Sequence, residues 1–144
     1  MVSIRLGGSG HNATLEYMYH VEKLEFEKLV TDAIKSLPEE RLDAIKNVAF
    51  MVEDEPDDEQ RKSLGLRPCQ SLFGLYQGVP LTERRGGYAL TLPDRITIFQ
   101  NPHMQFASNH EELEAQIKNT VWHEVAHYFG LNHDRIEELE RKQK

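Results

Sequence analysis

Two histidines and a glutamate on one turn of a helix, with a third histidine soon after, stand out in the stretch TVWHEVAHYFGLNHD, residues 120–134. Each helical residue advances by ~100°, so His123 and His127 lie one turn apart on the same face and can bind one ion. Glu124 lies beside them, where its carboxylate can hold a water on that ion as a general base. The spacing therefore predicts a metal site with hydrolytic chemistry.

Gly130 is expected to end this helix, because glycine adopts the left-handed conformation common at helix C-termini. The chain reversal would bring His133 back to the ion as a third ligand. Three histidines and a water form the open, four-coordinate arrangement of a catalytic zinc site. Asp134 would either hydrogen-bond a ligand histidine or replace His133 as the ligand. The predicted cofactor is therefore Zn²⁺, with Glu124 as the catalytic residue.

Other segments must position this helix. Apolar residues between 26 and 37 recur at helical spacing, Pro38 follows them, and a short helical turn is expected at 39–45. A capping box of Ser108 and Glu111 would begin the long helix that ends at Phe129. Three segments rich in β-branched and aromatic residues are predicted strands: 47–53, 71–81 and 94–102.

This order of elements favours an α+β fold over a doubly wound sheet, because most connections are too short for repeated crossovers. We expect a small mixed β-sheet with two main α-helices packed on one face and the histidine-bearing helix near the C-terminus. Residues 1–14, which contain GGSG, are expected to be a flexible linker or a cloning remnant, and residues 15–144 a single domain. The acidic stretch 53–59 is interpreted as a solvated loop.

Composition limits the classes of partner. With 17 Lys+Arg against 24 Asp+Glu, the net charge of −7 would repel a phosphate backbone, so no nucleic acid is expected. No apolar run approaches the ~20 residues of a membrane helix, so no membrane interaction is expected. A single cysteine, Cys69, and the lack of an export signal favour the cytoplasm.

Several other polar and aromatic side chains are not predicted to belong to the site. Thr120 would line the cleft or bond to its own helix backbone. Trp122 and Phe129, on the far side of the helix, are expected to pack, as are Tyr76 and Tyr88. His103 and His110 are expected to be surface histidines, and Cys69 is not expected to be a nucleophile.

The stretch HEVAHYFGLNHD resembles the metzincin-type metallopeptidase signature H-E-x-x-H-x-x-G-x-x-H-D in all its fixed residues. Across residues 20–135 the chain resembles more closely the small bacterial zincin-like metallopeptidases. The similar segments are FEKLVTDAIKSLPEE, NVAFMVEDEP, LFGLYQGVPLTER, LPDRITIFQNP and TVWHEVAHYFG, in that order. The resemblance implies a minimal zincin fold, Glu124 as base, and three zinc ligands, His123, His127 and His133.

Two features bear on the substrate cleft. All four methionines precede His123, so the methionine turn that follows the third histidine in metzincins is missing. Little sequence follows His133, so the cleft is expected to be open or to be completed by a protein partner. By resemblance to larger zincins, residues 96–100 are either the edge strand along which a peptide lies or an ordinary strand of the sheet.

The sequence thus predicts a zinc metallopeptidase that acts on a peptide or protein substrate. One alternative is a metal-dependent ribonuclease of the rRNA-maturation type, which shares a similar histidine spacing but typically lacks the glutamate and offers a basic groove. The other alternative is a zinc-binding regulatory module without turnover.

Overall fold

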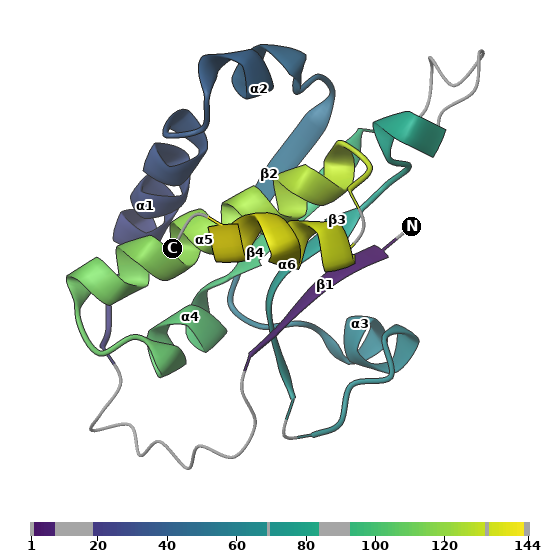
Figure 1. The fold of residues 1–144 in the computed structure, drawn as a ribbon. Helices are drawn as coiled ribbons and strands as arrows, with labels where there is room; N and C mark the ends of the chain where they lie inside the picture. Colours follow the sequence, from purple (N-terminus) through teal and green to yellow (C-terminus); the bar gives the residue numbers. More distant parts are fainter. Residues whose placement is uncertain (1, 8–18, 69, 84–92, 132, 143–144) are drawn as a thin grey trace.

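The computed structural model describes residues 2–7, 19–68, 70–83, 93–131 and 133–142 (Figure 1). The described part is an α+β fold, as predicted. Its elements along the chain are β1 (Val2–Gly7), α1 (Lys23–Lys35), α2 (Glu39–Ala44), β2 (Val48–Glu53), α3 (Asp58–Ser63), β3 (Ser71–Gln77), the 3₁₀ turn η2 (Leu81–Glu83), β4 (Asp94–Phe99), α4 (Gln100–Phe106), α5 (His110–Tyr128) and α6 (His133–Lys142).

The sheet is mixed and has the strand order β1-β3-β4-β2. β2 and β4 are parallel, whereas β3 is antiparallel to both β4 and β1. β4 is therefore an interior strand with hydrogen-bonded neighbours on both sides. This overturns one of the two interpretations of residues 96–100, because an interior strand has no free edge for a peptide.

The N-terminal segment contributes to this sheet. Residues 1–14 were expected to be flexible, but Val2–Gly7 form strand β1 along the outer edge of β3. The physical reason is that an uncovered β3 would leave a row of backbone N–H and C=O groups without partners in the sheet. The alternation of apolar and polar residues in VSIRL suits such a strand. The remainder of that segment lies outside the described residues.

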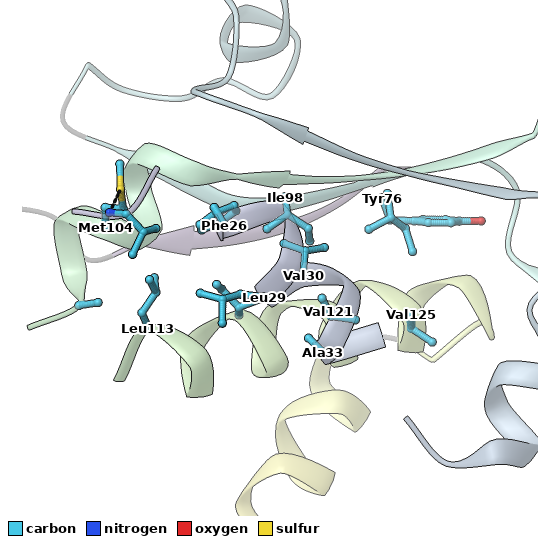
Figure 2. Close-up of a cluster of buried hydrophobic side chains, with 14 of the residues drawn as sticks. Phe26, Leu29, Val30, Ala33, Tyr76, Ile98, Met104, Leu113, Val121 and Val125 are labelled. Carbon is cyan, nitrogen blue, oxygen red and sulfur yellow. Dashed lines mark hydrogen bonds between the residues drawn. The ribbon is translucent and has the colours of Figure 1, made fainter. Parts of the chain in front are cut away.

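The main core lies between the sheet and two helices, α1 and α5, which pack against each other (Figure 2). Tyr76 of β3 and Ile98 of β4 lie on the face of the sheet that these helices cover. The helices supply two stripes at the predicted helical spacing: Phe26, Leu29, Val30 and Ala33 from α1, and Leu113, Ile117, Val121 and Val125 from α5. The prediction of two main helices on one face is therefore confirmed.

The ends of α5 agree with the predicted length but not with the predicted cap. The N-cap is Asn109, whose side chain accepts a hydrogen bond from the Glu112 N–H, and Glu112 in turn accepts one from the Ser108 N–H. The predicted pair of Ser108 and Glu111 was wrong by one position. Asparagine is as effective a cap as serine, so the sequence signal did not distinguish the two.

Two short helices were missed because their sequences contain helix-breaking or acidic residues. α4 follows β4 directly and has Pro102 in its first turn, where proline is tolerated because the first N–H groups need no helical partner. α3 begins inside the acidic stretch that was interpreted as a loop. Its cap is a reciprocal pair, in which the Asp57 carboxylate accepts from the Gln60 N–H and the Gln60 side chain accepts from the Asp57 N–H.

The third missed helix, α6, follows the histidine motif. Its Ile136 is fully buried, and its surface carries the ion pairs Arg135–Glu138 and Lys142–Glu138, each 2.9 Å long. Hydrogen bonds from Lys142 and then Arg135 hold the pKa of the Glu138 carboxyl below its ordinary value. Ile136 is thus a buried apolar contact on a helix whose other residues are mostly charged, and one such residue gives little signal in the sequence.

Among the described helices, none combines the length and apolar character that crossing a membrane requires.

Candidate metal centre

His123 and His127 lie in the last two turns of α5, four residues apart on one face, as the sequence predicted. Their ring centroids are 5.0 Å apart and their ring planes meet at 62°. Two imidazoles that bind one zinc ion through Zn–N bonds of about 2.0–2.1 Å at a tetrahedral angle have centroids about 5 Å apart. The donor set therefore fits zinc in both chemistry and spacing.

Both rings are largely removed from solvent. His123 is 3% exposed and His127 is 8% exposed, so the two imidazoles border the core rather than extend from the surface. Burial restricts their side-chain freedom before any ion binds, which lowers the entropic cost of binding. α5 thus presents two fixed nitrogen donors.

Glu124 is fully buried and lies over Gly74 of β3. A Cβ at Gly74 would approach the Glu124 Cγ to 3.1 Å and the Thr120 Cγ2 to 2.7 Å. The missing side chain is therefore what lets helix α5 come this close to the sheet. Gly74 was not among the predicted site residues, although a glycine inside a strand is a recognised sign of close backbone approach.

A bulge in β3 shapes the same place. Arg5 of β1 pairs with Gly74 and Leu6 pairs with Leu72, so Phe73 is an extra residue in β3. Both neighbouring residues consequently face the helices: Gly74 lies under α5, and the Phe73 ring lies 4.8 Å from that of His103. Bulges that redirect side chains in this way are common beside active sites.

Thr120 and His103 support the helix next to Glu124. The Thr120 hydroxyl donates to the Gln116 carbonyl oxygen at 2.9 Å, which is the backbone bond considered from the sequence. His103 of α4 contacts both α5 and β4. Its Nε2 lies 2.9 Å from the Thr120 hydroxyl, and its Nδ1 lies 2.8 Å from the Phe99 carbonyl oxygen. Because a carbonyl only accepts, Nδ1 carries a proton in that contact.

His103 was therefore assigned wrongly as a surface histidine, since it is fully buried. The sequence offered no signal for this, because the burial comes from α4, a helix that was not predicted. His110 does lie near the surface, with its ring nitrogens close to Tyr19 and Glu114.

The chain reversal after α5 occurs where it was predicted. Gly130 has φ +90°, and its N–H donates to the His127 carbonyl oxygen at 2.9 Å, while the Leu131 N–H donates to the Ala126 carbonyl oxygen at 3.1 Å. This pair of bonds is a Schellman motif, which ends a helix at a left-handed residue. α6 then begins at His133.

The third ligand remains a prediction. His133 is placed by its backbone, but its side chain lies outside the described residues, and Asp134 is exposed in the first turn of α6. Within the part of the chain that is described, no three histidine, cysteine, aspartate or glutamate side chains converge on a common point. The choice between His133 and Asp134 thus rests on the motif.

The remaining candidates take packing roles where they are described. Tyr76 is fully buried and its hydroxyl donates to Asp94 at 2.6 Å. Trp122 and Phe129 lie on the far side of α5, where they line a hollow of about 180 Å³ together with residues of the α1–α2 region. Tyr88 and Cys69 lie outside the described residues.

A family model described as a zincin-like metallopeptidase matches residues 45–143. The matched region contains β2, β3, β4 and α5, and it leaves out α1 and β1. No curated protein matches the chain.

Proposed function

Because the chain belongs to the zincin-like metallopeptidase family, we propose that it is a zinc-dependent peptidase in which Glu124 is the general base. His123 and His127 would hold the ion, and His133 would be the third ligand, with Asp134 as its alternative or its hydrogen-bond partner. The observation that carries the proposal is the arrangement on α5: two imidazoles 5.0 Å apart with a fully buried carboxylate between them in sequence.

A zinc ion at this position would polarise the scissile carbonyl and bring the pKa of a bound water to about 7. Glu124 would accept the proton of the attacking water and pass it to the leaving amine, which is the ordinary role of a positioned carboxylate in acid–base catalysis. Its burial against Gly74 restricts where the carboxylate can lie. The Thr120–His103 contact fixes the preceding turn of α5 on α4.

The charge of the chain favours peptides over nucleic acids as substrates. A net charge of −7 does not provide the electrostatic attraction that phosphate backbones require. Backbone pairing with a peptide, in contrast, does not depend on net charge.

The decisive experiment is mass-spectrometric profiling of a complex peptide library incubated with the zinc-loaded protein. The matched control is Glu124→Gln with the same zinc content, because this change removes the base and keeps the predicted ligands. We expect cleavage products with the wild-type protein only. If both proteins hold one zinc ion and neither cleaves any peptide, the proposal of a general peptidase fails, and a zinc-binding regulatory module becomes the better assignment.

A further inference from the structure

The strand beside the candidate metal centre has its outer edge covered by the chain's own N-terminal segment. β3 passes under Glu124 at Gly74, and β1 pairs with the edge of β3 that faces away from β4. Figure 1 shows β1 as the outermost strand of the sheet on this side. α5 lies against β1 as well as against β3 and β4.

The helical geometry of α5 places the histidines toward β1. Around the helix, Val121 and Val125 face the core that β4 and α1 share, and Glu124 comes next, over β3. With ~100° per residue, His127 and His123 follow Glu124 on the side away from that core. In the sheet, the strand next to β3 on the side away from β4 is β1. The backbone of β1 is therefore the extended segment that borders the histidine face.

The contact between β1 and β3 is the kind that any extended peptide can make. It is an antiparallel ladder from Val2↔Gln77 to Arg5↔Gly74, followed by the bulge at Phe73. Ladder hydrogen bonds use backbone groups, so they do not by themselves select a sequence. β1 also lies outside residues 45–143, the region that the family model matches, whereas β3 and α5 lie within it.

We propose that Val2–Gly7 is an internal competitor that covers the edge of β3 to which an extended peptide substrate adds. This inference rests on the proposed peptidase function and concerns its regulation. A segment of the same chain competes at an effective concentration that reaches the millimolar range for short connections. A free peptide must therefore displace β1 from β3. Access to the candidate centre then depends on how often the pairing between β1 and β3 opens.

Proline substitutions in β1 test this in the full chain. In an antiparallel ladder, alternate residues direct their N–H groups toward the partner strand. Of the adjacent residues Ser3 and Ile4, both within the regular part of the register, one donates to β3 and the other does not. Proline removes the N–H, so only one of the two variants, Ser3→Pro or Ile4→Pro, should release β1. The other variant is its matched control.

The probe is a synthetic peptide with the sequence of residues 2–7, acetylated and amidated, added to isotope-labelled, zinc-free protein. Nuclear magnetic resonance follows the amide signals of β3, and circular dichroism checks that both variants are folded. We expect the peptide to shift the β3 signals in one variant at a concentration at least tenfold lower than in the other variant and in the wild-type protein. The amides on the outer edge of β3 should also exchange with solvent at least tenfold faster in that variant, until peptide is added.

Two results would overturn the proposal. The first is that both folded variants and the wild-type protein bind the peptide with the same affinity, and the second is that none of them shows a shift in the β3 signals. If a single variant fails to fold, the double variant Ser3→Gly/Ile4→Gly, which weakens strand formation and retains every N–H, takes its place against Ser3→Thr/Ile4→Val. The binding measurement needs neither zinc nor turnover, so a failure of the peptidase proposal would leave its outcome unchanged.

Discussion

Gly74 lies where β3 passes under α5, and the space that its side chain would fill is occupied by Thr120 and Glu124. This close approach brings the helix that carries the candidate centre into direct contact with the sheet. A change of one methyl group at this point should therefore alter both the stability of the fold and the position of Glu124.

Gly74→Ala would place a Cβ 2.7 Å from the Thr120 Cγ2 and 3.1 Å from the Glu124 Cγ. Overpacking of this kind typically costs about 1–3 kcal/mol. We expect a loss of unfolding free energy in that range, measured by urea denaturation, and a fall in kcat/KM of at least tenfold.

The double variant Gly74→Ala/Thr120→Ser is the control, because serine removes the nearest methyl group and keeps the hydroxyl that bonds to Gln116 and His103. It should recover part of the lost stability. If Gly74→Ala is as stable and as active as the wild-type protein, the close contact does not constrain Glu124.

The third metal ligand is also a question of single residues. His133 and Asp134 begin α6, and the motif assigns the ligand role to His133. We expect His133→Ala to lower zinc affinity far more than Asp134→Ala, because loss of a hydrogen-bond partner outside the coordination sphere typically costs only about 10–100-fold. Competition with a chromogenic chelator measures both. Wild-type affinity in His133→Ala would exclude that residue, and a larger loss in Asp134→Ala would assign the ligand to the aspartate.

Between elements, the turn from α5 to α6 sets where His133 can lie. Gly130 has φ +90° at this turn, and a Cβ there would come within 2.6 Å of the Thr82 Cγ2 in η2. Gly65 offers a matched comparison, because it also has a positive φ, +65°, but no atom lies within 4 Å of its added Cβ.

Gly65→Ala should therefore lose only about 1–2 kcal/mol of unfolding free energy, the cost of backbone strain at this positive φ. It should bind zinc normally. Gly130→Ala should lose more unfolding free energy than that, measured by urea denaturation, because the clash with Thr82 adds to the strain. It should also bind zinc at least tenfold more weakly, because α6 must shift. Equal zinc affinity in the two variants would mean that this turn does not position a ligand.

Elements with strong local patterns were predictable from the sequence. The stripes of α1 and α5 and the three β-rich segments repeat over several residues, so helices, strands and the face shared by His123 and His127 follow from spacing alone. The short helices were not predictable in this way. α6 contributes the buried Ile136, and one apolar residue is not a periodic pattern. α4 contains Pro102 in its first turn, whereas the sequence suggested only that Pro102 ends the preceding strand.

Contacts between distant segments were harder still. The interior position of β4 depends on which strands pair with it. β1 is an edge strand because it pairs with the side of β3 that faces away from β4. Likewise, the burial of His103 requires α4 and the contact at Gly74 requires α5 to lie across β3. Such features depend on tertiary pairing, which the periodicity of one segment does not encode.

At the scale of the whole molecule, α5 is the element on which the others converge. It packs against α1, α4, α6 and three strands of the sheet, and it carries both histidines. An ion that binds these histidines in the folded state alone must therefore stabilise the entire domain through linkage. Thermal unfolding thus reports on the metal centre without any knowledge of the substrate.

Zinc at a free concentration of 100 times its Kd should stabilise the fold by about 2.7 kcal/mol. For a domain of this size, that corresponds to a rise in Tm of roughly 5–15 °C over the chelator-treated protein, measured by differential scanning calorimetry. His123→Ala should lose this rise because an imidazole donor is gone. Glu124→Gln should keep it, since the carboxylate acts as a base and not as a ligand. A rise that persists in His123→Ala would place the zinc elsewhere, whereas a rise that disappears in Glu124→Gln would make Glu124 a ligand and remove it from the role of general base.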